Sequence, residues 1–178
     1  NSTQGNGMAR PFRHLCLILA CLLAPALPAP AETIAAADST LIASFLALPN
    51  DSLEVHIEAA EDLAERARKT TDVPERRRLL TAAAARNPAL TRPWVDLADL
   101  AMDLGYRDAA AASLAAARVT IDFLEGEARR PAIRDYSVTR AWYHYEMGEW
   151  EDGRRWGQRA VKFKAGMNGS LVTALNSA

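Results

Sequence analysis

The stretch WVDLADLAMDLGYRDAAAASLAAARVTID, residues 94–122, decides the fold of this chain. Its tryptophan, leucine and alanine residues recur three and four positions apart, which is the spacing of one face of an α-helix. Gly105 separates two such faces. Glycine commonly ends a helix because it adopts a positive φ without steric cost. The stretch therefore predicts two helices joined by a tight turn at Gly105.

An earlier segment, residues 60–88, repeats this pattern at an offset of 34 residues. Leu97 and Ala98 of the later copy correspond to Leu63 and Ala64 of the earlier one. Small side chains at matched positions let two helices approach closely, while large apolar side chains fill the space beside them. The repeated spacing predicts that both segments form the same helix–turn–helix unit.

A third copy aligns through Ala141, Gly148 and Ala160, but it is shifted along the chain. It begins 43 residues after the second copy instead of 34, so residues 118–135 hold about nine additional positions. We expect the return helix of the second pair to be longer and to accommodate them.

The 34-residue spacing resembles the tetratricopeptide repeat, a helix–turn–helix unit that occurs in arrays. The agreement is strongest at Trp94, Gly105 and Ala110, while Ala101 and Asp122 stand where the family usually has tyrosine and proline. The resemblance implies an all-α fold, a right-handed solenoid of antiparallel helix pairs with about three repeats after an N-terminal helix. It also implies a role in binding other proteins, since such repeats rarely carry out chemistry.

Polar caps and helix-breaking residues mark the expected boundaries of the other helices. Residues 33–48 predict an N-terminal helix, and residues 50–52 offer an N-cap for the next one. Thr91 is expected to cap the central pair, whereas Gly126 and Pro131 are expected to interrupt the chain before the third pair. The resulting division assigns residues 1–31 to upstream residues and a signal peptide, 32–51 to an N-terminal helix and linker, 52–165 to the repeat domain, and 166–178 to the start of a further helix.

Residues 8–31 have the three parts of a secretory signal. Met8 opens a short basic stretch, an apolar run covers residues 15–27, and Ala29 and Ala31 form a small-residue cleavage motif. A helix needs roughly 20 apolar residues to span a bilayer, and this run is shorter and ends in prolines. We therefore expect cleavage after Ala31, delivery to the bacterial periplasm and no membrane insertion of the mature chain.

Both cysteines of the chain, Cys16 and Cys21, lie within this expected signal. Cleavage after Ala31 would leave a mature chain with no disulfide, no thiol nucleophile and no cysteine ligand for a metal. The alternative is that residues 18–21 act as a lipobox, in which case Cys21 would be acylated and would anchor a lipoprotein. The apolar run continues beyond Cys21, which favours the form without a lipid anchor.

The sequence after residue 31 contains no recognisable pattern of catalytic, cofactor or metal-binding residues. His56 and His144 are its two histidines, and neither has a second histidine four positions away for a paired zinc site. It has no nucleophile elbow and no glycine-rich phosphate loop. The formal net charge is −1 for the full chain and −3 after residue 31, where 19 basic and 22 acidic residues remain, which indicates no basic surface for nucleic acid. We therefore expect a protein that is not an enzyme and that binds no metal, no cofactor and no nucleic acid.

The resemblance places the binding surface on the inner side of the array, which the first helix of each pair lines. Acidic groups there surround an aliphatic and aromatic centre, which suits a peptide or protein segment with basic and apolar residues. Trp142 is the expected main anchor, because a buried tryptophan commonly dominates an interface. The alternative is that Trp142 and Tyr145 pack beneath a following repeat. The groove-facing positions are Arg92, Val95, Asp99, Met102 and Asp103 in the second copy and Asp135, Val138, Trp142, Tyr145 and Glu146 in the third.

Two functions are compatible with these patterns. The first is a non-catalytic scaffold or adaptor in the periplasm that holds a partner protein or peptide in this groove. The alternative is the N-terminal repeat region of a longer envelope protein involved in polysaccharide export or synthesis. A reading frame that continues beyond Ala178 would favour the second function, and an immediate stop codon would favour the first. The sequence indicates no particular oligomeric state.

Overall fold

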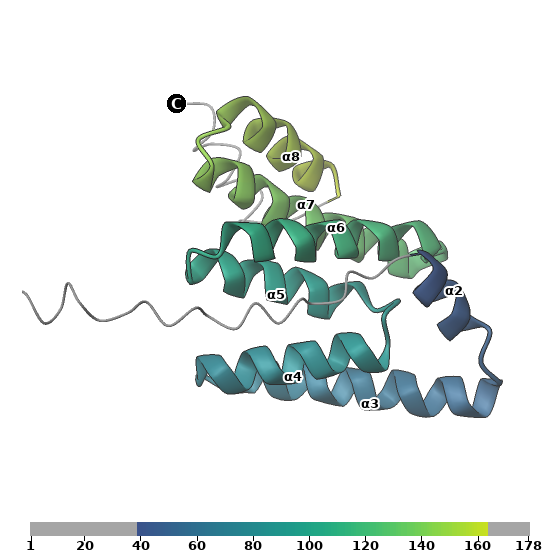
Figure 1. Cartoon of the computed structure of the whole chain (residues 1–178). Coiled ribbons are helices and arrows are strands. Elements are labelled where there is room, and N and C mark those ends of the chain that lie inside the picture. Colours follow the sequence, from purple (N-terminus) through teal and green to yellow (C-terminus); the bar gives the residue numbers. More distant parts are fainter. Residues whose placement is uncertain (1–38, 164–178) are drawn as a thin grey trace, which may run out of the picture. The chain divides into compact units, whose positions relative to one another are not determined.

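The computed structural model describes residues 39–163, and all regular structure in this range is helical (Figure 1). The predicted all-α class is thus confirmed for the described part of the chain. None of the helices in it is both long and apolar enough to cross a bilayer. The predicted signal segment and the predicted final helix lie outside these residues. The helices are α2 (Ser39–Leu46), α3 (Asn50–Lys69), α4 (Val73–Arg86), α5 (Thr91–Asp103), α6 (Arg107–Phe123), α7 (Gly126–Glu146) and α8 (Trp150–Lys162).

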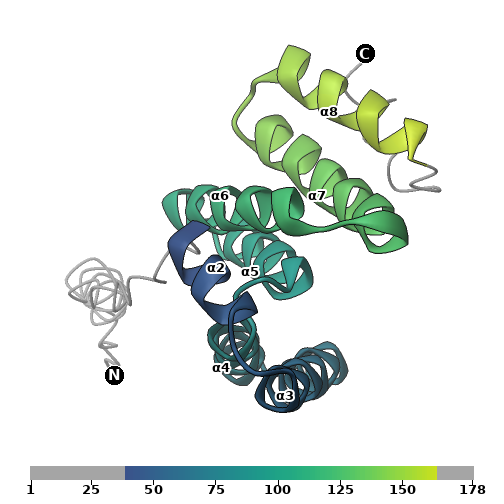
Figure 2. The same ribbon diagram turned by 90° about the vertical axis from the view of Figure 1, so that its right-hand side faces the viewer.

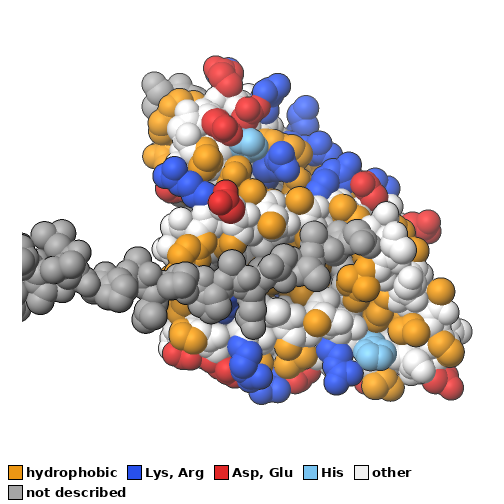
Figure 3. All heavy atoms as spheres, in the orientation of Figure 1, with side chains coloured by type: hydrophobic (Ala, Val, Ile, Leu, Met, Phe, Trp, Pro, Cys, Tyr) orange, Lys and Arg blue, Asp and Glu red, His pale blue; other side chains and the backbone are white. Residues whose placement is uncertain are grey.

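The helices pack in three successive pairs, α3 with α4, α5 with α6, and α7 with α8. Figure 2 shows that α5 lies between α4 and α7, and α5 contacts both of them. The helix α6 also contacts α7 and α2. In the space-filling view of Figure 3, charged side chains gather over α3 and α4 and over α7 and α8, with fewer over α6 between them. The central pair, α5 with α6, therefore has packing partners on both sides.

Large apolar side chains of the central pair form the middle of the core. Trp94 and Leu97 of α5 and Leu114 of α6 are buried together with Leu80 of α4. The indole N–H of Trp94 donates to the carbonyl of Pro88 at 3.2 Å, so its polar atom is satisfied in the interior. Small side chains without exposed surface allow the close approach of the helices. These residues are Ala83, Ala98, Ala110 and Ala117.

The turns of the central and third pairs close in the same way. Gly105 has a φ of +76° and Gly148 a φ of +75°, a conformation that glycine adopts without strain. The amide of Tyr106 donates to the carbonyl of Ala101 at 2.8 Å, and the amide of Glu149 makes the equivalent bond at 2.9 Å. This bond across the helix end is the mark of a Schellman motif. The predicted turn at Gly105 is confirmed.

Two predicted N-caps are wrong. The helix α3 begins at Asn50 directly after Pro49, whose carbonyl accepts from the amide of Leu53 at 2.9 Å, and no side chain caps this end. Pro49 already has the φ that a helix start needs. Thr91 lies inside α5, and its buried hydroxyl bonds to the hydroxyl of Thr120 at 2.7 Å. A buried hydroxyl needs such a partner, which takes it away from the helix end.

The chain after the central pair differs most from the prediction. Gly126 has a φ of +57° and α7 begins there, so Pro131 lies inside α7 instead of interrupting the chain. Pro131 and Glu127 are exposed, so water can bind the Glu127 carbonyl that loses its amide donor. The additional residues lengthen α7 (21 residues against 13 in α5) more than α6 (17 against 14 in α4). The expected lengthening of the return helix is confirmed only in part: α6 is longer than α4, but Gly126 turns the chain directly after α6, so α7 holds the rest.

Candidate functional site

Two cavities open beside Arg92, at the start of α5. The smaller has a volume of about 230 Å³ and lies between the first turns of α5 and α7. The larger has a volume of about 580 Å³ and lies along α3. Leu90 and Arg92 line both cavities, which makes the cavities direct neighbours. We term the two cavities together the Arg92 groove.

The wall of the smaller cavity is mostly apolar. Val95 comes from α5, Leu124 follows the end of α6, and Ala128, Pro131 and Ala132 come from α7. The three α7 residues belong to the turns that the prediction assigned to a break in the chain. The helical extension of α7 therefore builds one side of this cavity.

Four carboxylates of α3 line the larger cavity. Two of them are compensated on the same helix, because Glu65 bonds to Arg68 and Asp62 has a guanidinium of the next turn 3.6 Å away. The other two, Glu58 and Glu61, are exposed and have no ion-pair partner within residues 39–163. Uncompensated negative charge therefore gathers at one end of this cavity. The four carboxylates are Glu58, Glu61, Asp62 and Glu65.

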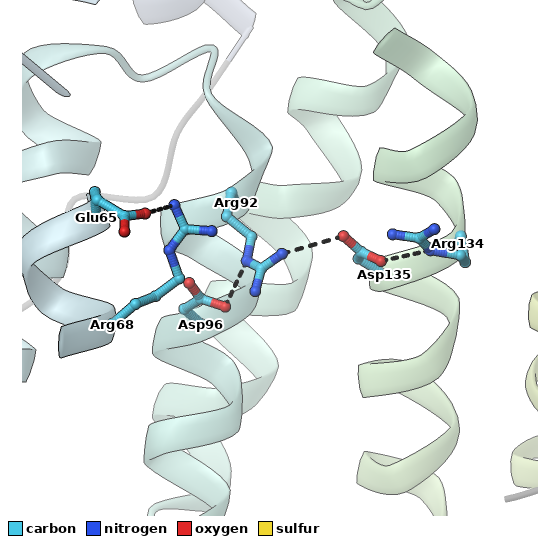
Figure 4. Close-up of polar contacts among 6 residues, drawn as sticks. All are labelled: Glu65, Arg68, Arg92, Asp96, Arg134 and Asp135. Carbon is cyan, nitrogen blue, oxygen red and sulfur yellow. Dashed lines mark hydrogen bonds and ion pairs between the residues drawn. The ribbon is translucent and has the colours of Figure 1, made fainter. Parts of the chain in front are cut away.

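Arg92 is held by carboxylates of two helices (Figure 4). Its Nε donates to Oδ1 of Asp96 at 2.8 Å within α5, and its Nη1 donates to Oδ2 of Asp135 in α7 at 3.4 Å. Asp135 also accepts from Nε of Arg134 at 2.8 Å. The positive charge of Arg92 is thus compensated within the protein. Its side chain forms a fixed ridge between the two cavities and joins α5 to α7.

Two carboxyl groups of α5 near Arg92 are shifted toward the neutral form. Burial raises the pKa of Asp96 against the opposing charge of Arg92, and Oδ2 of Asp96 has no hydrogen-bond partner in the described part of the chain. Burial also raises the pKa of Asp99 to about 6, although a hydrogen bond with Thr139 of α7 lowers it. Asp99 is thus part of the contact between α5 and α7.

The structure brings together three of the positions predicted to face a groove. Arg92, Val95 and Asp135 line the smaller cavity. The acidic residues of α3 were missed because the template positions were assigned only in the second and third copies. The sequence does contain a pattern that indicates them, because carboxylates recur at three- and four-residue spacing in residues 58–65 and so share one helix face. The predicted positions that line neither cavity are Asp99, Met102, Asp103, Val138, Trp142, Tyr145 and Glu146.

Trp142 belongs to an aromatic cluster near the turn between α7 and α8. Its ring centroid lies 5.5 Å from that of Tyr145, and the Tyr145 centroid lies 4.9 Å from that of Trp150, both in edge-to-face geometry. Trp150 is 50 % exposed. The cluster presents aromatic surface to solvent, and it is a separate feature from the Arg92 groove.

One group of side chains has the composition of a cation site. Nδ1 of His144 lies 2.6 Å from Oε2 of Glu149, and one oxygen of Asp152 lies close to both. A histidine that binds a metal normally donates its other ring N–H to a partner. Nε2 of His144 is buried without any partner in the described residues. A hydrogen bond from His144 to Glu149, which ties the end of α7 to the start of α8, accounts for the contact.

Comparisons with known proteins do not assign this chain to a family. No family model, no curated protein and no solved structure matches it. The described residues define the class of protein in coarse terms, as an all-helical protein with a two-part surface groove.

Proposed function

We propose that this chain is a non-catalytic scaffold of the tetratricopeptide type, a right-handed solenoid of antiparallel helix pairs that holds a peptide or protein segment. Successive pairs pack on one another, as the units of a solenoid do. The turn glycines Gly105 and Gly148 have the same conformation at the offset found in the sequence. Ala98 and Ala117, at small positions of the template, are fully buried. These features support a repeating unit.

The Arg92 groove is the observation that carries the binding role. Its walls come mainly from α3, α5 and α7, the first helices of the three pairs, which would line the inner surface of such an array. The smaller cavity has the mostly apolar lining and few fixed polar groups that are usual in binding sites, and the larger cavity adds charged groups beside it. A segment that crosses the Arg92 ridge would contact both cavities without breaking the bonds that hold Arg92.

We further propose that the scaffold acts in the bacterial periplasm after cleavage behind Ala31. N-terminal sequencing of the exported protein should then start at Glu32. A mature protein that starts at a lipidated Cys21 would contradict this location and would make the scaffold a membrane-anchored one.

Site-specific photo-crosslinking tests the binding role. Benzoylphenylalanine replaces Ala128 in the smaller cavity or Glu61 in the larger one, in the full chain produced in its native cells. Ala115, an exposed alanine of α6 outside both cavities, is the matched control position. We expect a discrete partner protein to be captured from positions 128 and 61 and not from 115. Capture from position 115 alone, or from none of the three, would contradict the proposal.

A further inference from the structure

We infer that the occupant of the Arg92 groove is an extended peptide segment in which a lysine or arginine lies within a few positions of an aliphatic residue. The basic side chain enters the larger cavity, and the aliphatic side chain enters the smaller one. This inference rests on the proposed binding role and adds the chemistry of the partner.

The larger cavity favours a cation because its own cations are already paired. Arg68 is bonded to a carboxylate of α3, and Arg92 is held by the carboxylates of α5 and α7. Glu58 and Glu61 have no such partner within the described residues, so the charge left over in this cavity is negative. A lysine or arginine side chain supplies the missing positive charge, whereas a carboxylate or phosphate would be repelled.

The smaller cavity favours a single aliphatic side chain. Its volume of about 230 Å³ is below the roughly 300–1,000 Å³ of pockets that hold small organic ligands. The charged residues at its rim, Arg92 and Asp135, are bonded to each other and present no unpaired charge. The wall formed by Ala128, Pro131 and Ala132 carries no polar side chain. An aliphatic side chain therefore fits this cavity better than a polar one.

The two cavities lie close enough to be filled by neighbouring residues of one peptide. Leu90 and Arg92 form part of both walls, so the cavities adjoin each other at these side chains. Each residue of an extended chain spans about 3.3–3.6 Å, so the basic and aliphatic residues lie within a few positions of each other.

Selection from a random library of short peptides displayed on phage tests this chemistry on the full chain. We expect the selected peptides to share a lysine or arginine at a constant short distance from leucine, isoleucine, valine or methionine. The double variant E58Q/E61Q should lose the preference for the basic residue and keep that for the aliphatic residue. The variant A128F fills the smaller cavity from an exposed helix position. It should lose the preference for the aliphatic residue and keep that for the basic residue.

Matched controls separate these effects from changes in net charge or surface hydrophobicity. The variant E54Q/E127Q removes two carboxylates outside both cavities, and A115F adds the same ring on α6. Both controls should select the same motif as the parent chain. Circular dichroism melting of every variant checks that the fold is retained.

The outcomes distinguish this inference from the binding role. Selection of acidic peptides, or a basic preference that survives in E58Q/E61Q, would overturn the inference and leave the binding role intact. If the parent chain selects no peptide, both the inferred peptide chemistry and the proposed binding role are contradicted. A dimer in sedimentation that A128F but not A115F dissociates would show that a second copy fills the groove. A photo-crosslink from position 128 to residues 1–38 or 164–178 of the same molecule would show that the chain fills its own groove, and either result overturns the inference.

Discussion

The central pair, α5 and α6, and the third pair, α7 and α8, share the same turn geometry but are held together by different contacts. The core of the central pair is apolar, with Trp94, Leu97 and Leu114 buried in it. In the third pair, Arg140 donates to the hydroxyl of Tyr136 at 2.6 Å, and its guanidinium lies 5.0 Å from the ring centroid of Trp156. Burial of apolar surface thus stabilises the central pair, whereas aromatic and charged contacts join the helices of the third pair.

The difference follows from the surroundings of each pair. The central pair has neighbours on both sides, while α7 is the main packing partner of α8 in the described part of the chain. A covered pair can rely on apolar burial, whose contribution scales with the area removed from water. At the solvent boundary, arginine and aromatic side chains bury their apolar parts and keep a polar end in water. The smaller cavity of the Arg92 groove lies between the first turns of α5 and α7, where the central and third pairs meet.

Truncation of Leu114 to alanine should cause the largest loss of stability. Leu114 is 2 % exposed in the centre of the core, so the change removes apolar contacts and leaves a cavity, which costs about 2–5 kcal/mol. Leu104, which is 41 % exposed at the end of α5, is the matched control, and Leu104→Ala should cost less than about 0.5 kcal/mol. Urea unfolding followed by circular dichroism measures both. Equal losses would mean that burial of apolar side chains does not stabilise the central pair more than exposed ones do.

The contact between the two pairs should become more stable as the pH falls. Burial raises the pKa of Asp99 from 3.8 to about 6, so the folded state favours its protonated form. The unfavourable effect of the buried charge is present above pH 6 and is lost as the pH falls through about 6 towards 3.8. One pKa unit corresponds to about 1.4 kcal/mol, so the gain between pH 7 and pH 4 should be about 1–3 kcal/mol.

The variant Asp99→Asn sharpens this test. It keeps a polar group beside Thr139 and should flatten the dependence of the urea midpoint on pH. A smaller dependence should remain, because burial also raises the pKa of Asp96. Asp108→Asn, at an exposed position of α6, is the matched control and should behave like the parent chain. An unchanged pH dependence in Asp99→Asn would mean that Asp99 does not couple the two pairs.

Local patterns were sufficient to predict the central pair from sequence. Trp94 and Leu114 lie at helical spacing, and Gly105 supplies the positive φ of the turn, so periodicity and turn chemistry indicated the same structure. Caps were predicted less well, because Thr91 is used in a tertiary hydrogen bond to Thr120. The side chain that caps α4 is Asp72, which accepts from the amide of the third helical residue at 3.0 Å.

The Arg92 groove could be predicted only in part. Arg92 and Val95 follow from the repeat template, but the bond from Arg92 to Asp135 joins residues far apart in the chain. Pro131 was assigned to a break because proline disfavours helix interiors, whereas the exposed first turns of α7 tolerate it. The apolar wall of the smaller cavity depends on this tolerance. Rules on helix boundaries, applied to the local sequence alone, could therefore not have predicted this wall.

Replacement of Arg140 by methionine should weaken the third pair alone. The change keeps an apolar stem but removes the cation beside Trp156 and the donor to Tyr136, a loss of about 0.5–2 kcal/mol. Hydrogen exchange should become faster in α8 and stay unchanged in α5. Arg129→Met, at an exposed position of α7, is the matched control and should leave both unchanged. Faster exchange in α5 as well would mean that the two pairs unfold as one unit.

The smallest effect is expected from Trp142→Ala. The indole of Trp142 packs edge-on against Tyr145 and lines neither cavity, so the affinity for a peptide selected as described above should change less than about twofold. Fluorescence anisotropy with the labelled peptide measures this, and A128F is the variant expected to lose binding. A loss of tenfold or more, about 1.4 kcal/mol, would extend the binding surface along α7 from the Arg92 groove to the aromatic cluster. Trp142 would then be the main anchor, as the repeat template predicts. The central and third pairs would in that case differ in how they are stabilised but share one binding surface.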